Sequence, residues 1–247
     1  MSSIDMFEQV TDSGWRMGFT TLMKKELKTW FGTNAWWQQA LLWSLILVLF
    51  GSAGFADPEV GFLIFYMMAT IFPSIAVIII SQARILEEKR FGSAEWVLSK
   101  PVSRTAFILA KLIPAAISFS FSMIFIPGIL FYLVALAVGS TVPITSFLLS
   151  LIPLMLWQIF LSWLTMCVGT FFEKEGPVMA IPFPFIFIGP TLAQNPDFGP
   201  YGPWGLVMNS LSFVSTESYP IYPIIITVII LVVLAVISIY RFTKHEF

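Results

Sequence analysis

The sequence predicts an all-α integral membrane protein with six transmembrane helices, and three observations support that prediction. Of the 247 residues, 57% are apolar and only 11% are charged, whereas an average soluble domain carries roughly 25% charged residues. Apolar runs long enough to cross a bilayer recur along the chain, and the Lys and Arg residues gather between alternate pairs of these runs. We therefore expect residues 1–247 to form a single transmembrane domain.

The first expected element is an amphipathic helix over residues 12–34. At 100° per residue its large apolar side chains share one arc and three lysines lie opposite. A helix with Lys on one face and Trp or Phe on the other is typical of the membrane headgroup region; an ordinary soluble amphipathic helix is the alternative. Glu26 falls inside the apolar arc, so we expect it to pair with a cation such as Arg16. The arc holds Trp15, Phe19, Leu22, Met23, Leu27 and Trp30, and the lysines are Lys24, Lys25 and Lys28.

Residues 1–14 are polar and acidic and lack the basic start and apolar core of a cleavable signal peptide. Six spans are expected after them, each judged against the ~20 apolar residues that a helix needs to cross ~30 Å of hydrocarbon. The third is long enough that Pro114 or Pro127-Gly128 is expected to break it. Residues 196–219 are expected to form a short interfacial helix or a re-entrant hairpin. The spans are predicted near 36–56, 60–83, 105–138, 146–172, 177–195 and 220–241.

The distribution of Lys and Arg predicts the orientation of these spans. All thirteen fall in the segments of one side, and the other side holds only acidic residues: Asp57, Glu59, Asp197 and Glu217. Because cytoplasmic loops carry the excess of Lys and Arg, both termini are predicted to be cytoplasmic in a multi-pass protein of the cell membrane.

Several function classes are disfavoured by what the spans lack. No Asp, Glu, His, Lys or Arg lies in the middle of a predicted span, and a charge there costs at least ~2.5 kcal/mol and is kept mainly for function. This argues against a proton relay, an ion-coupled carrier or an intramembrane hydrolase. With one cysteine, Cys167, and one histidine, His245, a single chain cannot build a His/Cys metal site. The charges are clustered rather than spread over a basic face, so nucleic acid is not an expected partner.

Two spans carry stripes of mild polar residues. In the fourth, Gln158, Ser162, Thr165 and Gly169 share one face, and in the second Thr70, Ser74 and Ser81 do so. Packing of helices through small and hydroxyl residues is the favoured interpretation. The alternative is a translocation path lined by Thr70, Ser74, Gln158, Ser162 and Thr165.

The fifth span is unusually rich in proline, with Pro177, Pro182, Pro184 and Pro190. Proline removes a backbone donor, and freed carbonyls at membrane depth are tolerated only inside protein or facing a water-filled cavity. We therefore expect Pro182, Phe183 and Pro184 to lie at a subunit interface or along the path, away from lipid.

The densest group of charges is the segment 84–111, which holds six of the thirteen Lys and Arg residues. Pro101 biases the residue before it away from helical geometry, and Ser103 can cap the next helix. A short cytoplasmic helix over 87–100 is therefore expected between two spans. Its apolar anchors Phe91 and Trp96, with the charged Glu87, Glu88, Lys89, Arg90 and Glu95, suit a soluble partner; a solvated loop is the alternative.

From Glu88 this segment reads EKRFGSAEWVLSKPVSR. It resembles the inner-loop pattern E-x-x-x-G-T-x-E-x-L-L-x-x-P-V-S-R, followed by a Lys early in span three, of the ABC-2 family of membrane subunits of ATP-binding cassette transporters. Ser93 replaces the usual Thr and Val97 a usual Leu. The span count, the lead-in helix and the outer segment extend the resemblance over most of the chain. The matching residues are Glu88, Gly92, Glu95, Val97, Leu98, Pro101, Val102, Ser103, Arg104 and Lys111.

The resemblance implies a permease subunit, which we expect to be an exporter, powered by a separate ATPase present in two copies and paired with a second, identical or related permease. No Gly-Lys pair and hence no Walker A pattern occurs, so ATP and magnesium are expected on the partner and no enzymatic activity on this chain. A membrane anchor or assembly subunit that transports nothing is the alternative. The residues expected to contact the ATPase are Glu87, Glu88, Arg90, Phe91, Gly92, Glu95, Trp96, Leu98, Pro101 and Arg104, with Glu173, Lys174 and Glu175 of a second inner loop.

Overall fold

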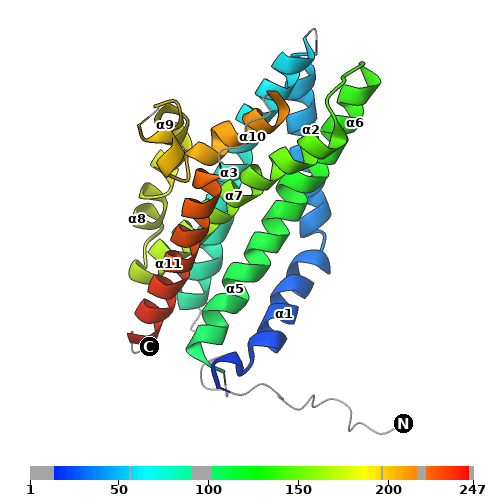
Figure 1. Cartoon of the computed structure of the whole chain (residues 1–247). Coiled ribbons are helices and arrows are strands. Elements are labelled where there is room, and N and C mark those ends of the chain that lie inside the picture. Colours follow the sequence, from blue (N-terminus) through cyan, green and yellow to red (C-terminus); the bar gives the residue numbers. More distant parts are fainter. Residues whose placement is uncertain (1–13, 56, 91–101, 196, 216–220, 245–247) are drawn as a thin grey trace, which may run out of the picture.

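The computed structural model describes residues 14–55, 57–90, 102–195, 197–215 and 221–244. Every regular element in these ranges is a helix, and six helices are long and apolar enough to cross a membrane (Figure 1). The predicted all-α fold with six spans is therefore confirmed. The spanning helices are Ala35–Ser52, Val60–Arg90, Arg104–Ala137, Ile144–Phe171, Glu175–Ala193 and Tyr222–Lys244.

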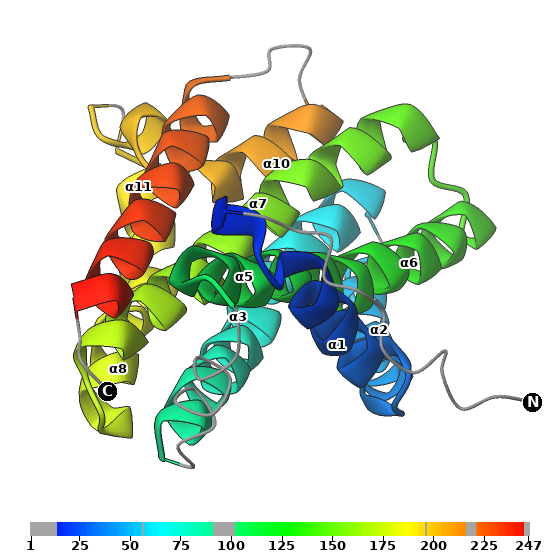
Figure 2. The same cartoon turned by 90° about the horizontal axis from the view of Figure 1, so that it is seen from below.

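The first and last described elements lie at the same end of the bundle, the lower end in Figure 1. They are the short helix η1 (Gly14–Arg16) and the C-terminal part of α11 (Tyr222–Lys244). We call this the inner end, because α3 (Pro58–Arg90) also brings its charged last turns here. Seen from this end, α5 (Arg104–Phe119) lies between α1 and α11 and contacts both (Figure 2).

The predicted amphipathic helix is α1 (Phe19–Phe31), which packs along the inner part of α5 and runs in nearly the same direction (Figure 1). Trp30 is buried, and Leu22 and Phe31 pack against the same apolar cluster. The arc residues within α1 are thus buried or partly buried, whereas Trp15 lies before α1 and is exposed. The lysines on the other face are exposed. Its location in the headgroup layer stays a prediction.

The third span is a continuous helical rod made of α5, η2 (Ser120–Phe125) and α6 (Ile126–Ala137). The break expected at Pro114 or Pro127-Gly128 is absent. Pro114 lies inside α5 and Pro127 lies just after η2, and the helix runs through both; membrane helices tolerate proline where local adjustments re-satisfy the freed backbone groups. The irregularity lies between the two sites instead: η2 is π-helical, and the N–H of Ile126 bonds the carbonyl of Phe121 five residues earlier.

The fifth span consists of two pieces, α8 (Glu175–Ala180) and α9 (Phe183–Ala193), separated at Ile181 and Pro182. Outside it lie η3 (Gly199–Tyr201) and α10 (Gly205–Ser215), which packs on α7 (Ile144–Phe171) and α9. Leu206 and Ser210 of α10 are fully buried. The outer segment thus contains a short helix, one of the two forms expected for it.

Close apolar packing joins α2 (Ala35–Ser52) to α6 in the outer half of the bundle. A Cβ on Gly51 would lie only 2.4 Å from Cε2 of Phe131, so this approach needs glycine. Phe131 stacks on Phe65 with ring centroids 4.3 Å apart and meets Phe62 edge-on at 5.3 Å. Such ring pairs contribute about 0.5–1.5 kcal/mol beyond their buried area, so an aromatic cluster holds the outer half together.

Candidate functional site

The structure describes part of the predicted coupling segment. Phe91, Gly92, Glu95, Trp96, Leu98 and Pro101 lie outside the described residues, as does the remainder of 91–101. Glu87–Arg90 belong to the last turn of α3 and do not begin a separate helix. Glu, Lys and Arg are good helix formers, so the second span continues as helix beyond residue 83, where it was expected to end.

The last turn of α3 lies against the loop between α7 and α8. Lys89 Nζ donates to the carbonyl oxygens of Thr170, at 3.1 Å, and Phe172, at 3.3 Å. These carbonyls belong to the C-terminal end of α7, where backbone acceptors need outside partners. Next to them, Arg90 Nη1 lies 3.1 Å from Glu175 Oε1, with both side chains about half exposed.

The structure thereby brings together the two segments that were predicted to contact a soluble partner. Glu87 at the end of α3 and both Glu173 and Lys174 in the second inner loop are exposed to solvent. Together with the Arg90–Glu175 pair they form one charged surface at the inner end.

The start of α5 is tied to both ends of the described chain. Ser103 caps the helix as predicted, accepting a hydrogen bond from the Ala106 N–H at 3.0 Å. Its own hydroxyl donates to the Trp15 carbonyl of η1. Arg104 Nη1 donates to the Thr243 carbonyl near the end of α11. The residues that follow the coupling segment are therefore anchored to the bundle.

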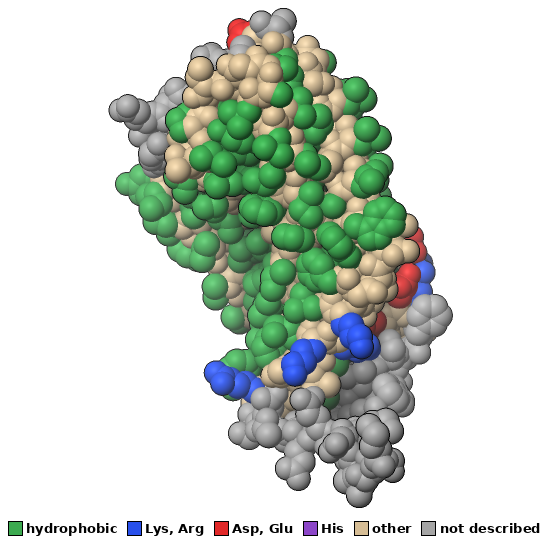
Figure 3. All heavy atoms as spheres, turned by 90° about the vertical axis from the view of Figure 1, so that its right-hand side faces the viewer, with side chains coloured by type: hydrophobic (Ala, Val, Ile, Leu, Met, Phe, Trp, Pro, Cys, Tyr) green, Lys and Arg blue, Asp and Glu red, His purple; other side chains and the backbone are tan. Residues whose placement is uncertain are grey.

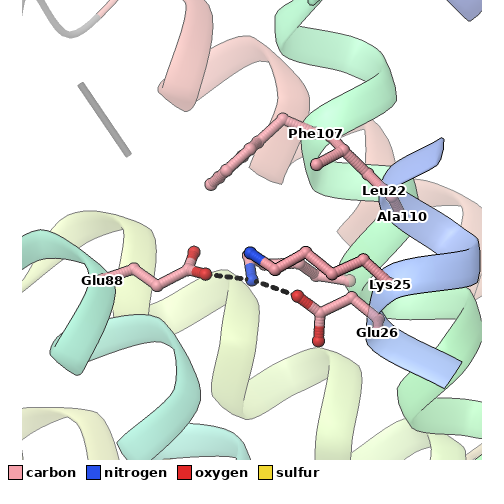
Figure 4. Close-up of a pocket in the computed structure, with 7 residues that line it drawn as sticks. Leu22, Lys25, Glu26, Glu88, Phe107 and Ala110 are labelled. Carbon is pink, nitrogen blue, oxygen red and sulfur yellow. Dashed lines mark hydrogen bonds and ion pairs between the residues drawn. The ribbon is translucent and has the colours of Figure 1, made fainter. Parts of the chain in front are cut away.

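One largely covered ammonium joins three helices at the inner end, at the centre of the dashed contacts to Glu26 and Glu88 in Figure 4. Lys111 Nζ of α5 lies 3.1 Å from Glu26 Oε1 of α1 and also bonds Glu88 Oε1 of α3. The Lys111 side chain is 10% exposed, and those of Glu26 and Glu88 are 20% and 23% exposed. Glu88 was expected to contact the partner. At least one of its carboxylate oxygens instead bonds Lys111 within the chain.

The prediction that Glu26 pairs with a cation is confirmed, but the suggested cation was wrong. Arg16 precedes the turn at Gly18 and is exposed, with its guanidinium over the ring of Trp15 at 5.0 Å from the centroid. Lys111 is nearer because α1 packs directly on α5. The sequence signalled that Glu26 needs a cation, since an acid inside an apolar arc faces another element of the protein, but it did not identify that element.

Arg84 provides a second cation beside this cluster. Its guanidinium lies 5.0 Å from the ring centroid of Trp30 and 5.3 Å from that of Phe119, a contact that contributes about 0.5–2 kcal/mol. Trp30 in turn donates its Nε1–H to Ser122 Oγ in the π-helical segment, at 3.1 Å. Arg84 and Lys111 both lie within spanning helices. The spans are thus free of charge in their middles but carry charge at their inner ends.

The polar stripes of the second and fourth spans meet in the interface between α3 and α7. Gln158 Nε2 donates to Ser74 Oγ and to the Ala69 carbonyl, both at 3.1 Å, and the hydroxyls of Ser81 and Ser162 lie 2.9 Å apart. These contacts agree with the helix-packing interpretation. A role along a substrate path stays a prediction for Thr70, Ser74, Gln158, Ser162 and Thr165, all of which are buried.

At the break in the fifth span, Pro182 is buried, Phe183 is partly buried and Pro184 is exposed. Further along α9, Phe187 and Ile188 are 61% and 52% exposed. No described residue covers this outward face of α9. Its predicted location at a subunit interface or along the path stays a prediction.

Comparison with known families connects this arrangement to a class of transporters. A family described as "ABC-2 family transporter protein" matches residues 4–196 of the chain. The chain belongs to this family. A search of curated proteins found no match. The family match identifies the chain as a multi-pass ABC-2 permease, the membrane component that works with an ATP-binding cassette ATPase and is typically not itself catalytic.

Proposed function

We propose that this permease is the membrane-spanning half of an exporter and that a separate ATPase docks on its inner end. One observation carries the proposal: the last turn of α3 and the α7–α8 loop form one charged surface through Lys89 and the Arg90–Glu175 pair. A partner that contacts the end of α3 would therefore also contact Glu173 and Lys174. Its movement would act on the ends of several spans at once.

The helices that begin or end at this surface can transmit such a movement into the bundle. α3 and α5 flank the coupling segment and run deep into the bundle. α3 is packed on α7 through hydroxyl and amide contacts and through a close approach in which a Cβ on Gly169 would lie 2.4 Å from Ile85 Cγ2. Packed interiors shift between discrete arrangements rather than deforming gradually. A push on the inner ends therefore moves whole helices.

In the proposed cycle, ATP and magnesium bind to two copies of the partner ATPase, whose closure is transmitted through the end of α3 and the α7–α8 loop. A second permease, identical or related, completes the path, and the uncovered face of α9 is the proposed contact surface. Substrate passes between the two permeases as they switch from inward to outward access. Both termini face the cytoplasm of a cell-membrane protein, in agreement with the gathering of Lys and Arg at the inner end.

The proposal is tested by co-purifying the tagged permease with its ATPase and reconstituting both in proteoliposomes. We expect the double charge reversal Glu173→Lys with Glu175→Lys to weaken ATPase association, and Gly92→Leu or Glu95→Gln to uncouple transport from ATP hydrolysis. Asp197→Lys, on the outer side, is the control and leaves association unchanged. Co-purification without ATP-dependent transport would favour the anchor function instead, and transport driven by a proton gradient without ATP would overturn the proposal.

A further inference from the structure

The third span changes its hydrogen-bond pattern near its middle. At the start of η2 the Ser120 N–H is shared between the carbonyls of Ala116 and Ile117. At its end the Ile126 N–H bonds the Phe121 carbonyl five residues earlier. A π-helical turn interrupts the regular ladder of i−4 bonds and is a recognised cause of kinks in long helices. η2 is therefore where α5 and α6 are least firmly held in line.

Two serine hydroxyls at η2 lack the bond that other buried serines of this protein make. Ser210 and Ser238 each donate to the carbonyl four residues earlier, at 3.1 and 2.7 Å. The Oγ atoms of Ser118 and Ser120 are buried and have no hydrogen-bond partner among the described residues. Because a buried hydroxyl without a partner is unfavourable, a rearranged turn that gives either serine an acceptor gains that bond.

η2 also lies where two apolar clusters meet along the third span. Phe119 and Met123 belong to the cluster of the inner half, which contains Trp30, whereas Ile124 and Phe131 belong to the cluster of the outer half. The boundary between the clusters falls inside η2, between Met123 and Ile124. The two parts of this span are thus packed against different neighbours, as are two bodies joined by a hinge.

The break between α1 and α2 lies beside η2. α1 ends at Phe31, and α2 begins four residues later. The ring of Phe31 meets that of Phe121 edge-on, with centroids 5.8 Å apart, and Trp30 donates its Nε1–H to Ser122 Oγ at 3.1 Å. α1 packs on α5 and is held to it by the charged contact described above. Because its connection to α2 is broken at this level, α1 can follow α5 without bending α2.

One face of this junction is open. Figure 3 shows the side of the molecule that carries α1, α2 and α6, where apolar side chains form a broad surface above the Lys and Arg side chains of the inner end. On η2 itself the side chains of Phe121 and Phe125 are exposed. A change of angle at η2 is therefore not blocked on its exposed face by another described helix.

We propose that η2 is a hinge in the third span, about which α5, with α1 attached, changes its inclination relative to α6. The outer part stays in place because α6 packs closely on α2 and among the aromatic rings. α5 begins directly after the coupling segment, so a push on that segment tilts α5 and α1 together. This use of the hinge by the ATPase rests on the proposed function, whereas the hinge itself is a property of the permease alone.

The hinge is tested by removing its extra residue. A π turn holds one residue more than an α turn, so deleting Phe121 lets the i−4 bonds run through while the helix faces on both sides keep their orientation. Phe121→Ala is the matched control, because it removes the same ring and keeps the chain length. We expect the deletion variant to unfold at or above the temperature of this control.

Relative motion is measured by double electron–electron resonance on the purified full-length permease in lipid nanodiscs. Spin labels are attached to p-acetylphenylalanine in place of Thr21 of α1 and Leu133 of α6, both of which are exposed. We expect a broad distribution of distances in the parent and in Phe121→Ala, and a narrow one in the deletion variant. Equal widths in all three would overturn the hinge.

A second variant keeps the chain length and decides the matter if the deletion prevents folding. Ile117→Cys with Phe125→Cys places thiols at two exposed positions on either side of Phe121, about 12 Å of helix apart. Linking them with a bis-maleimide of that length should narrow the distance distribution, and the unlinked dithiol should keep it broad. A distribution that stays broad after linking would overturn the hinge.

The use of the hinge in coupling is tested in proteoliposomes with the ATPase bound. ATP with vanadate should shift the distance between the labels in the parent and leave it unchanged in the deletion variant, which should hydrolyse ATP but lose transport. An equal shift and full transport in the deletion variant would overturn this step. If no ATPase associates with the parent, the proposed function fails, and the widths measured on the permease alone still decide the hinge.

Discussion

The outer and inner ends of the permease are held by different kinds of contact. In the outer half, Gly51 admits Phe131 into van der Waals contact with α2, and Phe131 stacks on Phe65. At the inner end, helices are joined by Lys111 between two carboxylates and by Lys89 on backbone carbonyls. Close apolar packing permits few alternatives, whereas exposed ion pairs such as that of Arg90 and Glu175 exchange partners at small cost. The outer half is thus suited to keep its shape and the inner end to be rearranged.

The largest effect is expected from removing the ammonium that joins three helices. Lys111→Met removes the ammonium that bonds both Glu26 and Glu88, and loss of one partner from a buried charge pair costs up to about 3–5 kcal/mol. We expect a large drop in the midpoint of thermal unfolding of the purified permease. If the variant were as stable as the parent, the charged cluster would not hold the inner end together.

A matched control separates charge imbalance from lost packing at this position. Adding Glu26→Gln and Glu88→Gln to Lys111→Met removes both carboxylates that Lys111 had bonded and should recover much of the lost stability. In proteoliposomes, this triple variant should still transport poorly, because α1 is no longer joined to α3 through a charged contact. Full transport by a stable triple variant would show that the cluster serves folding alone.

The next effect is expected in the outer half. Gly51→Ala places a Cβ 2.4 Å from Phe131 Cε2, and Phe131 is fully buried among other rings. Overpacking of this kind costs about 1–3 kcal/mol, measured as a lower unfolding midpoint and a smaller yield of monodisperse protein. Gly176→Ala is the control, because a Cβ there has no neighbour within 4 Å among the described residues. An unchanged unfolding midpoint in Gly51→Ala would mean that the outer half is less tightly packed than the structure indicates.

The fold could be predicted from sequence because bilayer thickness sets the length of each apolar run, and the capping role of Ser103 followed from local chemistry. The partner of Glu26 could not, because Lys111 is 85 residues away and reaches it only through the packing of α1 on α5. The π-helical segment in the third span had no comparable signal. Proline misled there, since a membrane helix can run through a proline where local adjustments of π type re-satisfy the freed backbone groups.

The site was predictable in outline rather than in its contacts. The two inner segments were identified by their charges, but the bonds from Lys89 to the end of α7 depend on how α3 and α7 pack. Glu88 fitted the family pattern and was expected to face a partner, yet the structure directs a carboxylate oxygen to Lys111. Sequence indicated which segments carry charge, and the fold determined which charges remain on the surface.

A smaller effect is expected where the inner end meets the π-helical segment. Trp30→Phe keeps an aromatic ring beside Arg84 but loses the hydrogen bond from Nε1 to Ser122. Hydrogen bonds between membrane helices average about 0.6 kcal/mol and reach ~1.7 kcal/mol, so the unfolding midpoint should fall modestly. Ser122→Ala should cost a similar amount, and the two changes together little more than either one. Additive losses would contradict a direct bond.

The smallest effect on stability is expected from changes to the pair of Arg90 and Glu175. The same pair gives the sharpest test of the inner end as a docking surface. Both side chains are about half exposed, and exposed pairs contribute about 0–1 kcal/mol, so Arg90→Gln should leave the unfolding midpoint nearly unchanged. The swap Arg90→Glu with Glu175→Arg restores an opposite-charge pair while exchanging the charges presented to a partner. If this surface receives the ATPase, the swapped permease unfolds like the parent but retains less ATPase on co-purification. If both retain equal amounts, the pair serves only to hold α3 against α8, and docking must rely on other residues of the inner end.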